Sequence, residues 1–144
     1  MKITIIGSSH FKEKKIEIKK ELIAIGHEPI IHPHYEDFVA GKRQDIWKMV
    51  EGGEHAQAKI ENDYIMWYYN QIVSSEAVLV LNLEKNGKEN YIGGNTFLEI
   101  GFAYVNDKKI FLYNSLPSED VCPYLDEIVA MQPVVLNQDL SNIK

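Results

Sequence analysis

Glu99 is the residue whose type and position most suggest chemistry. It closes the segment Gly93-Gly94-Asn95-Thr96-Phe97-Leu98-Glu99, which leads into a predicted helix. Backbone N–H groups after two glycines at a helix start can converge on an anion or a sugar. The positive end of the helix dipole favours the ionised form of a carboxyl one turn inside. An ionised carboxylate in a pocket is what nucleophilic attack at an anomeric carbon requires.

The same residues also fit a structural interpretation. Thr96-x-x-Glu99 has the spacing of a capping box, in which the glutamate bonds back to the backbone at the start of its own helix. In that case Glu99 would have no chemical role. The spacing is compatible with both interpretations.

A second candidate for ligand binding follows the first predicted strand. Residues 2–6 are β-branched and apolar and end at Gly7-Ser8-Ser9. A glycine and a serine between a strand and a helix can bind phosphate. The segment is neither GxGxxG nor a P-loop, so a strand-to-helix turn with a serine cap fits it equally well.

Asp63 is the candidate general acid. It lies in a predicted helix over residues 55–74, next to the aromatic residues Tyr64, Trp67, Tyr68 and Tyr69. These aromatic side chains could stack a base, but core packing together with a subunit interface is the interpretation we favour. A carboxylate beside an aromatic wall could donate a proton, whereas an exposed surface position is the alternative for Asp63.

The histidines and the cysteine give weaker signals. His32-Pro33-His34 could be read as a metal pair, but nothing nearby completes it and no CxxC or HExxH spacing exists. Cys122 has no evident histidine partner and is expected to be a passive thiol. We therefore expect no metal and no cofactor.

The predicted elements alternate between strand and helix. Strands are expected at 2–6, 28–32, 76–82, 110–113 and 133–136, and helices at 11–25, 55–74, 96–106 and 121–131. The Lys-Glu-rich face of the first helix, Lys15 included, is expected to be solvated. Residues 35–54 are expected to be a loop with one short helix near 44–50.

This alternation predicts a single domain over residues 1–144, an α/β, flavodoxin-like and Rossmann-like three-layer sandwich with a five-stranded parallel sheet. Ligands bind such sheets beyond the carboxyl ends of the strands, where the strand order reverses. In a flavodoxin-like order that point lies between the first and third strands. The loops there start at Gly7 and at Asn82.

Composition and charge exclude several classes of protein. The chain has 144 residues, 45% of them hydrophobic and 25% charged, which is the balance of a globular domain. A net charge of −6 argues against a binder of nucleic acid polymers, although a small nucleotide in a local pocket is compatible with it. A single cysteine favours a reducing, cytoplasmic setting. No targeting or membrane-spanning segment is visible.

The segment Glu99-Ile100-Gly101-Phe102-Ala103 resembles the E-x-G-x-A element of the nucleoside 2-deoxyribosyltransferase-like superfamily. That group includes deoxyribosyltransferases and nucleoside 5′-monophosphate N-glycosidases, and Gly7-Ser8 resembles the glycosidase branch. The resemblance implies a flavodoxin-like fold, a homodimer or larger assembly, and Glu99 as the nucleophile at C1′. It also implies a glycosyl-enzyme that water or a second base resolves.

The chain departs from the family pattern at three places. Ile5 and Ile6 stand where the family often has a tyrosine, and Tyr68 matches the position of its second carboxylate. Gly93 stands six residues before the glutamate, where the family has an acid or a serine. The glycine segment also resembles the PGGxGTxxE element of phosphoribohydrolases that release cytokinin-like bases, one residue short and without the proline.

Two functions from different classes follow. The first is cleavage or transfer at the N-glycosidic bond of a nucleoside or nucleoside 5′-monophosphate, with Glu99 as nucleophile and Asp63 as acid. Sugar or phosphate would then be held by Gly7, Ser8, Ser9, Gly93, Gly94, Asn95 and Thr96. The alternative is a non-catalytic nucleotide-binding or sensing module on the same fold. A scaffold that assembles through the aromatic helix is a third hypothesis.

Overall fold

The computed structural model describes residues 1–144 and contains one five-stranded sheet in the order β2-β1-β3-β4-β5. The strands are β1 (Lys2–Ile6), β2 (Glu28–Ile30), β3 (Ala77–Val80), β4 (Lys109–Leu112) and β5 (Val134–Val135). Every neighbouring pair is parallel, with Ile3 opposite both Pro29 and Ala77. The α/β class, the flavodoxin-like order and the five parallel strands predicted from the sequence are confirmed.

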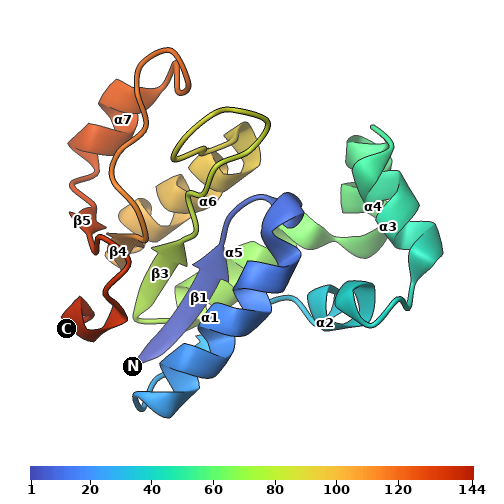
Figure 1. Cartoon of the computed structure of the whole chain (residues 1–144), viewed down its shortest axis with the longest axis horizontal. Helices are drawn as coiled ribbons and strands as arrows, with labels where there is room; N and C mark the ends of the chain where they lie inside the picture. The colour runs from blue at the N-terminus through green and yellow to red at the C-terminus, as the bar shows by residue number, and fades with distance from the viewer.

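Helices cover the sheet and extend from its β2 edge. They are α1 (Lys12–Ala24), α2 (His34–Val39), α3 (Gln44–Glu51), α4 (His55–Asn62), α5 (Tyr64–Ser74), α6 (Gly94–Val105) and α7 (Leu125–Ala130), with short 3-10 turns η1 (Ser9–Phe11) and η2 (Leu140–Asn142). The connection from β1 to β2 runs toward one edge of the sheet, and the connection from β2 to β3 runs back past β1 in the opposite direction. Because parallel connections are right-handed, α1 covers one face of the sheet, and α5 and α6 cover the other. Figure 1 shows α2, α3 and α4 projecting beside the sheet.

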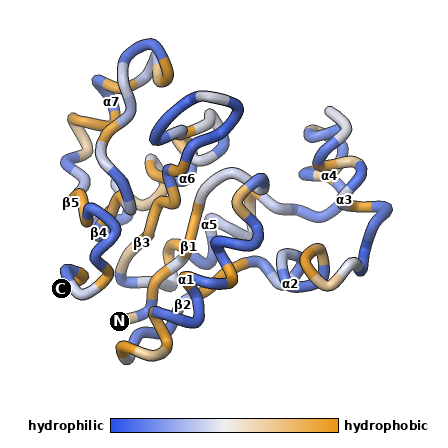
Figure 2. Tube along the Cα trace, viewed as in Figure 1, coloured by the Kyte–Doolittle hydropathy of each residue, from blue (hydrophilic) through white to orange (hydrophobic).

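The core follows the two central strands. All four residues of β3 and the last four of β1 are buried, and their apolar character is visible along the tube in Figure 2. A parallel strand covered on both faces needs such a continuous apolar run. The core therefore holds the carboxyl ends of β1 and β3 rigidly side by side. No helix in the structure is long and apolar enough to cross a lipid bilayer.

Asn82 closes the sheet just beyond β3. Its side chain is fully buried, accepts a hydrogen bond from the Asn114 backbone N–H at 2.8 Å, and donates to the Ser115 carbonyl oxygen at 2.8 Å. The side-chain amide of Asn114 donates in return to the Asn82 carbonyl oxygen at 3.1 Å. These bonds satisfy backbone groups where the strands separate, so the loop after β3 leaves the sheet in a fixed direction.

The predicted helix over 55–74 is wrong as one element. The structure divides it into α4 and α5 at Asp63, whose φ of 50° is left-handed. The Asn62 side chain donates to the Ala58 carbonyl oxygen at 2.9 Å. Asn and Asp adopt such turn conformations most readily. Apolar residues recur with helical spacing both before and after Asp63, so the periodicity of the sequence alone does not reveal that the helix is interrupted there.

Residues 35–54 contain more helix than predicted. α2 and α3 occupy most of this segment, whereas the sequence predicts a loop with one short helix. The two helices pack through Phe38 and Trp47, whose ring centroids lie 5.1 Å apart. The Lys12 ammonium lies 3.7 Å from the centroid of the Trp47 ring. These contacts are tertiary, which explains why the local pattern missed them.

The turn after β1 needs glycine. Gly7 has a φ of 144°, and a Cβ placed on it would lie 2.8 Å from the backbone oxygen of Leu81. A side chain would therefore force β1 and the β3 end apart. Glycine lets the turn pass against the neighbouring strand at the edge where the site forms.

We expect Gly7→Ala to destabilise the fold more than Gly26→Ala. Gly26, which ends α1, also has a positive φ (91°), but a Cβ there meets no atom within 4 Å. Its substitution should cost about 1 kcal/mol of backbone strain. Gly7→Ala should cost about 1–3 kcal/mol more, because the contact with Leu81 adds overpacking. Urea unfolding of both variants measures the difference, and equal losses would contradict the close approach.

Candidate functional site

A cavity of about 200 Å³ opens beyond the carboxyl ends of the central strands. This size suits a small organic molecule. Every predicted binding residue lines it together with Glu99, namely Gly7, Ser8, Ser9, Gly93, Gly94, Asn95 and Thr96. Its other walls come from the segment after β2, from α4 and from α5. The cavity therefore lies where the strand order reverses, as expected for this class of sheet.

Asp63 is not part of this cavity. It lies at the exposed junction of α4 and α5 and is absent from the cavity lining. The left-handed turn that it forms directs Tyr64 and Tyr68 of the following helix to the cavity instead. The interpretation of Asp63 as a general acid beside the reacting atoms is therefore not supported by its position.

Glu99 faces the cavity and does not cap its helix. α6 begins at Gly94, after an N-cap at Gly93 whose backbone is extended and which makes no side-chain cap. Thr96 therefore lies inside the first turn, and the capping-box interpretation is wrong. The Glu99 carboxylate is 4% exposed and accepts a hydrogen bond from the side-chain amide of Asn95 at 3.1 Å.

Burial dominates the titration of Glu99. Removal from water raises the pKa of this carboxyl from 4.5 to about 7. The positive charge of Lys15, the hydrogen bond from Asn95 and the charge of Lys59 each act in the opposite direction. At neutral pH a substantial fraction of Glu99 is therefore ionised although the side chain is buried. A group poised in this way can act as a nucleophile or as a base.

One side of the cavity carries a free cation. The Lys85 ammonium donates to the Ser8 hydroxyl at 3.0 Å and lies 4.9 Å from the centroid of the Tyr91 ring. It forms no ion pair with any carboxylate. Desolvation and the neighbouring Lys88 both lower its pKa. Lys85, Ser8 and the uncapped start of α6 together form an anion-attracting end of the cavity.

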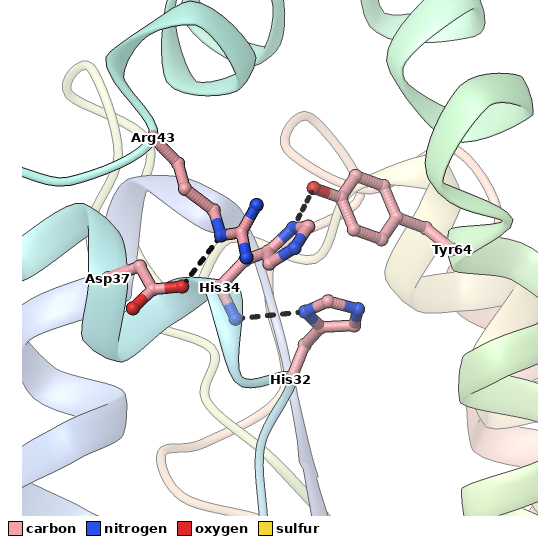
Figure 3. Close-up of polar contacts among 5 residues, drawn as sticks. All are labelled: His32, His34, Asp37, Arg43 and Tyr64. Atoms are coloured by element: carbon pink, nitrogen blue, oxygen red, sulfur yellow. Dashed lines mark hydrogen bonds and ion pairs between the residues drawn. The ribbon is translucent and has the colours of Figure 1, made fainter.

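The opposite side is built of imidazole and aromatic rings (Figure 3). The His32 ring nitrogen Nδ1 accepts a hydrogen bond from the His34 backbone N–H at 3.0 Å. The His34 ring bonds to the Tyr64 hydroxyl at 2.8 Å. Burial, with the charges of His34, Lys15 and Arg43, lowers the pKa of His32 to about 4. His32 is therefore neutral at physiological pH.

The sequence suggests only a metal pair for these two histidines. In the structure, no group of three or more His, Cys, Asp or Glu side chains is arranged to hold a metal ion. The informative sequence signal was their place directly after the second strand, at the same edge as Gly7. His10, by contrast, is exposed and does not line the cavity.

Tyr68 contributes a hydroxyl with no partner. Tyr68 lines the cavity, and its Oη is buried without a hydrogen-bond partner within the chain. Burial, with the charges of Tyr35 and Glu99, raises the pKa of this phenol well above its usual value. It is therefore a permanent donor at neutral pH. A buried unpaired hydroxyl is costly, which marks this wall as one that a ligand would complete.

Comparisons with known proteins find a likeness in structure. No protein-family model matches the sequence, and no curated protein matches it. A CMP N-glycosidase from Clostridium botulinum, BcmB, has a similar structure, with a TM-score of 0.48 and 14% sequence identity. The match covers 94% of this chain and 84% of that chain. A likeness at this level concerns the path of the chain and says nothing about the substrate of this protein.

We expect Glu99→Gln to flatten the pH dependence of stability. Because the folded pKa of Glu99 is about 7 against 4.5 for the free side chain, its stability contribution is complete below pH 4.5. That contribution is lost as the pH rises through 7. The loss should amount to roughly 2–3 kcal/mol between pH 5 and pH 8.

Urea unfolding of both proteins at several pH values measures this effect. His32, whose folded pKa is depressed, destabilises both proteins equally as the pH falls from 6.5 through 4, so it cancels in the difference. Parallel curves for wild type and Glu99→Gln would show that Glu99 is not the group that titrates.

Proposed function

We propose that this chain catalyses cleavage or transfer at the N-glycosidic bond of a nucleoside or nucleoside 5′-monophosphate, with Glu99 as nucleophile. The observation that carries the proposal is that Glu99 is the one carboxylate among the buried residues and that it lines the cavity at the strand-order reversal. A solvated surface glutamate would need no such setting. Burial also keeps bulk water from the carboxylate, which strengthens its interactions with a bound ligand.

The proposed reaction proceeds in two displacements. A Glu99 carboxylate oxygen forms a bond to C1′ while the bond from C1′ to the base nitrogen breaks, and its electron pair leaves with the base. The resulting glycosyl ester is then attacked at C1′ by water, in hydrolysis, or by a second base, in transfer. The second attack releases Glu99 as a carboxylate, and the attacking water or acceptor base gives up one proton. That proton balances the one taken up by the departing base, so the enzyme returns to its starting state.

The departing base must take up a proton. Because Asp63 lies outside the cavity, this proton cannot come directly from that carboxyl. The titratable side chains on the aromatic side of the cavity include His34 and Tyr64, and His55 of α4 also lines the cavity. The rings of His32, Tyr64 and Phe38 also line this side and offer faces and edges suited to a planar heterocycle. We therefore place the base on this side.

The sugar and phosphate belong at the other end of the cavity. The turn after β1 and the start of α6 both line the cavity there, beside Lys85, whose ammonium donates to the Ser8 hydroxyl. An anionic group would pair with the free ammonium and with the helix start. No metal or other cofactor is needed in this scheme. Homo-oligomeric assembly stays a prediction, to which the exposed apolar residues Ile65, Met66 and Leu98 of α5 and α6 are relevant.

The central test is release of base. Purified protein is incubated with a panel of nucleosides and their 5′-monophosphates, with and without a free acceptor base, and the products are separated by chromatography. Free base or an exchanged nucleoside is expected for wild type and lost by at least about 10³-fold in Glu99→Gln, since the nucleophile is removed. Asp63→Asn is the matched control, because it neutralises a carboxyl outside the cavity and should keep activity.

The outcomes separate the two functions. Base release that survives Glu99→Gln would overturn the role of Glu99. Thermal stabilisation by a nucleotide without any product would favour the non-catalytic binding or sensing module. A protein that neither binds nor converts any member of the panel would contradict both.

Lys85 should select for phosphate. We expect Lys85→Met to raise the KM for a nucleoside 5′-monophosphate by about 10-fold or more, because a charge-assisted hydrogen bond is lost. The KM for the corresponding nucleoside should change little. Lys88→Met removes the same charge from an exposed position on the same loop and is the control. Equal effects of Lys85→Met on both substrates would place the phosphate elsewhere.

A further inference from the structure

Lys15 is buried although its neighbours in sequence predict a solvated face. The side chain is 1% exposed, which makes it the one lysine or arginine among the buried residues. The expectation that it belongs to the solvated Lys-Glu face of the first helix is therefore wrong. A buried ammonium is strongly unfavourable without compensating groups, so the groups that surround the Lys15 ammonium must stabilise it.

The contacts of the Lys15 ammonium point to the cavity wall. Its Nζ donates to the Gly7 carbonyl oxygen at 2.8 Å and lies 3.9 Å from the centroid of the Tyr35 ring. Gly7 and Tyr35 both line the cavity that Glu99 faces. No carboxylate lies within 4 Å of this ammonium. Its partners are thus a carbonyl dipole and an aromatic face, both neutral.

The buried cation and the buried carboxylate flank the same cavity. Lys15 lies in the first turns of α1 and Glu99 in the first turns of α6. These helices cover opposite faces of the sheet, and both begin at its carboxyl edge. No direct ion pair joins the two groups, yet the Lys15 charge acts on the Glu99 carboxyl and favours its ionised form.

We infer that Lys15 is a positioning residue for the proposed reaction, which keeps Glu99 in its carboxylate form from across the cavity wall and fixes the turn at Gly7. This inference rests on the proposed function. Among the groups that favour ionisation of Glu99, the Lys15 charge has the largest effect, ahead of Asn95 and Lys59. Lys15 thus offsets part of the effect of burial on the pKa of the nucleophile.

Other groups around Glu99 do not replace Lys15. Asn95, on the same helix, donates a neutral hydrogen bond, and Lys59 of α4 has a smaller effect on the carboxyl. Tyr68 of α5 keeps its proton, and His32 after β2 is neutral at physiological pH. The Lys15 charge itself contributes to the low pKa of His32. One ammonium therefore favours an anionic Glu99 and a neutral His32 together.

The test removes the charge while keeping the shape. Lys15→Met retains an unbranched side chain, and Lys15→Gln also retains a donor for the Gly7 carbonyl oxygen. Lys20→Met, at an exposed position of the same helix, is the control. Urea unfolding selects the Lys15 variants that fold. The Glu99 carboxyl is then titrated by ¹³C NMR in each folded protein and assigned by comparison with Glu99→Gln.

We expect the Glu99 titration midpoint to rise by about one pH unit in the Lys15 variants and to stay unchanged in Lys20→Met. Base release at pH 7 should fall several-fold and recover toward the wild-type rate at higher pH. Lys15→Arg, which keeps the charge, should restore most of the wild-type midpoint. A folded Lys15→Met or Lys15→Gln protein with an unshifted midpoint would overturn the inference.

The two proposals fail in distinguishable ways. The NMR titration reads the coupling of Lys15 to Glu99 whether or not any base is released. If the midpoint shifts and no substrate is converted, the electrostatic coupling holds and the glycosidic function fails. If base is released with Glu99 as nucleophile and the midpoint does not shift, only the role of Lys15 fails.

Discussion

Burial of the Glu99 carboxylate is the constraint on which the site depends. An ionised carboxyl taken out of water is unfavourable unless charges and donors compensate it. This chain supplies a buried ammonium on α1, which covers the other face of the sheet, a side-chain amide one turn away and a second lysine on α4. The compensation is partial, since the pKa of Glu99 stays near 7. Because no cation pairs directly with Glu99, its carboxylate oxygens stay available to a ligand. A direct ion pair would occupy them.

The sheet topology is what brings these groups together. Gly7 follows β1, His32 follows β2, and the loop to Gly93 follows β3, so segments far apart in sequence meet at one edge. Their separation is set by strand spacing and by the close contact of Gly7 with Leu81. Because the core fixes the ends of β1 and β3, the loops need little ordering of their own. The anion-attracting side and the aromatic side of the cavity thus lie on either side of the first strand.

The sequence was informative where the signal was local and continuous. The apolar runs of β1 and β3 and the alternation of elements predicted the sheet, and the glycine segments predicted much of the cavity lining. The sequence was misleading where contacts between elements decide whether a side chain is buried or exposed. Lys15 lies within a run of charged residues and yet is buried, because it shares the buried face of α1 with Ile18 and Leu22. Asp63 looked well placed on a continuous helix, but the left-handed turn at that residue exposes it.

Several features of the cavity are unfavourable to the empty protein and would be satisfied by one kind of ligand. Tyr68 holds a buried hydroxyl with no acceptor, Lys85 holds a cation with no carboxylate, and Glu99 is buried near its titration point. A neutral core would be more stable than this arrangement. A molecule with an anionic end, a polar middle and a planar aromatic end would satisfy each group in turn. This chemical profile fits the proposed nucleoside 5′-monophosphate, and the fit would be the same for a binding module as for an enzyme.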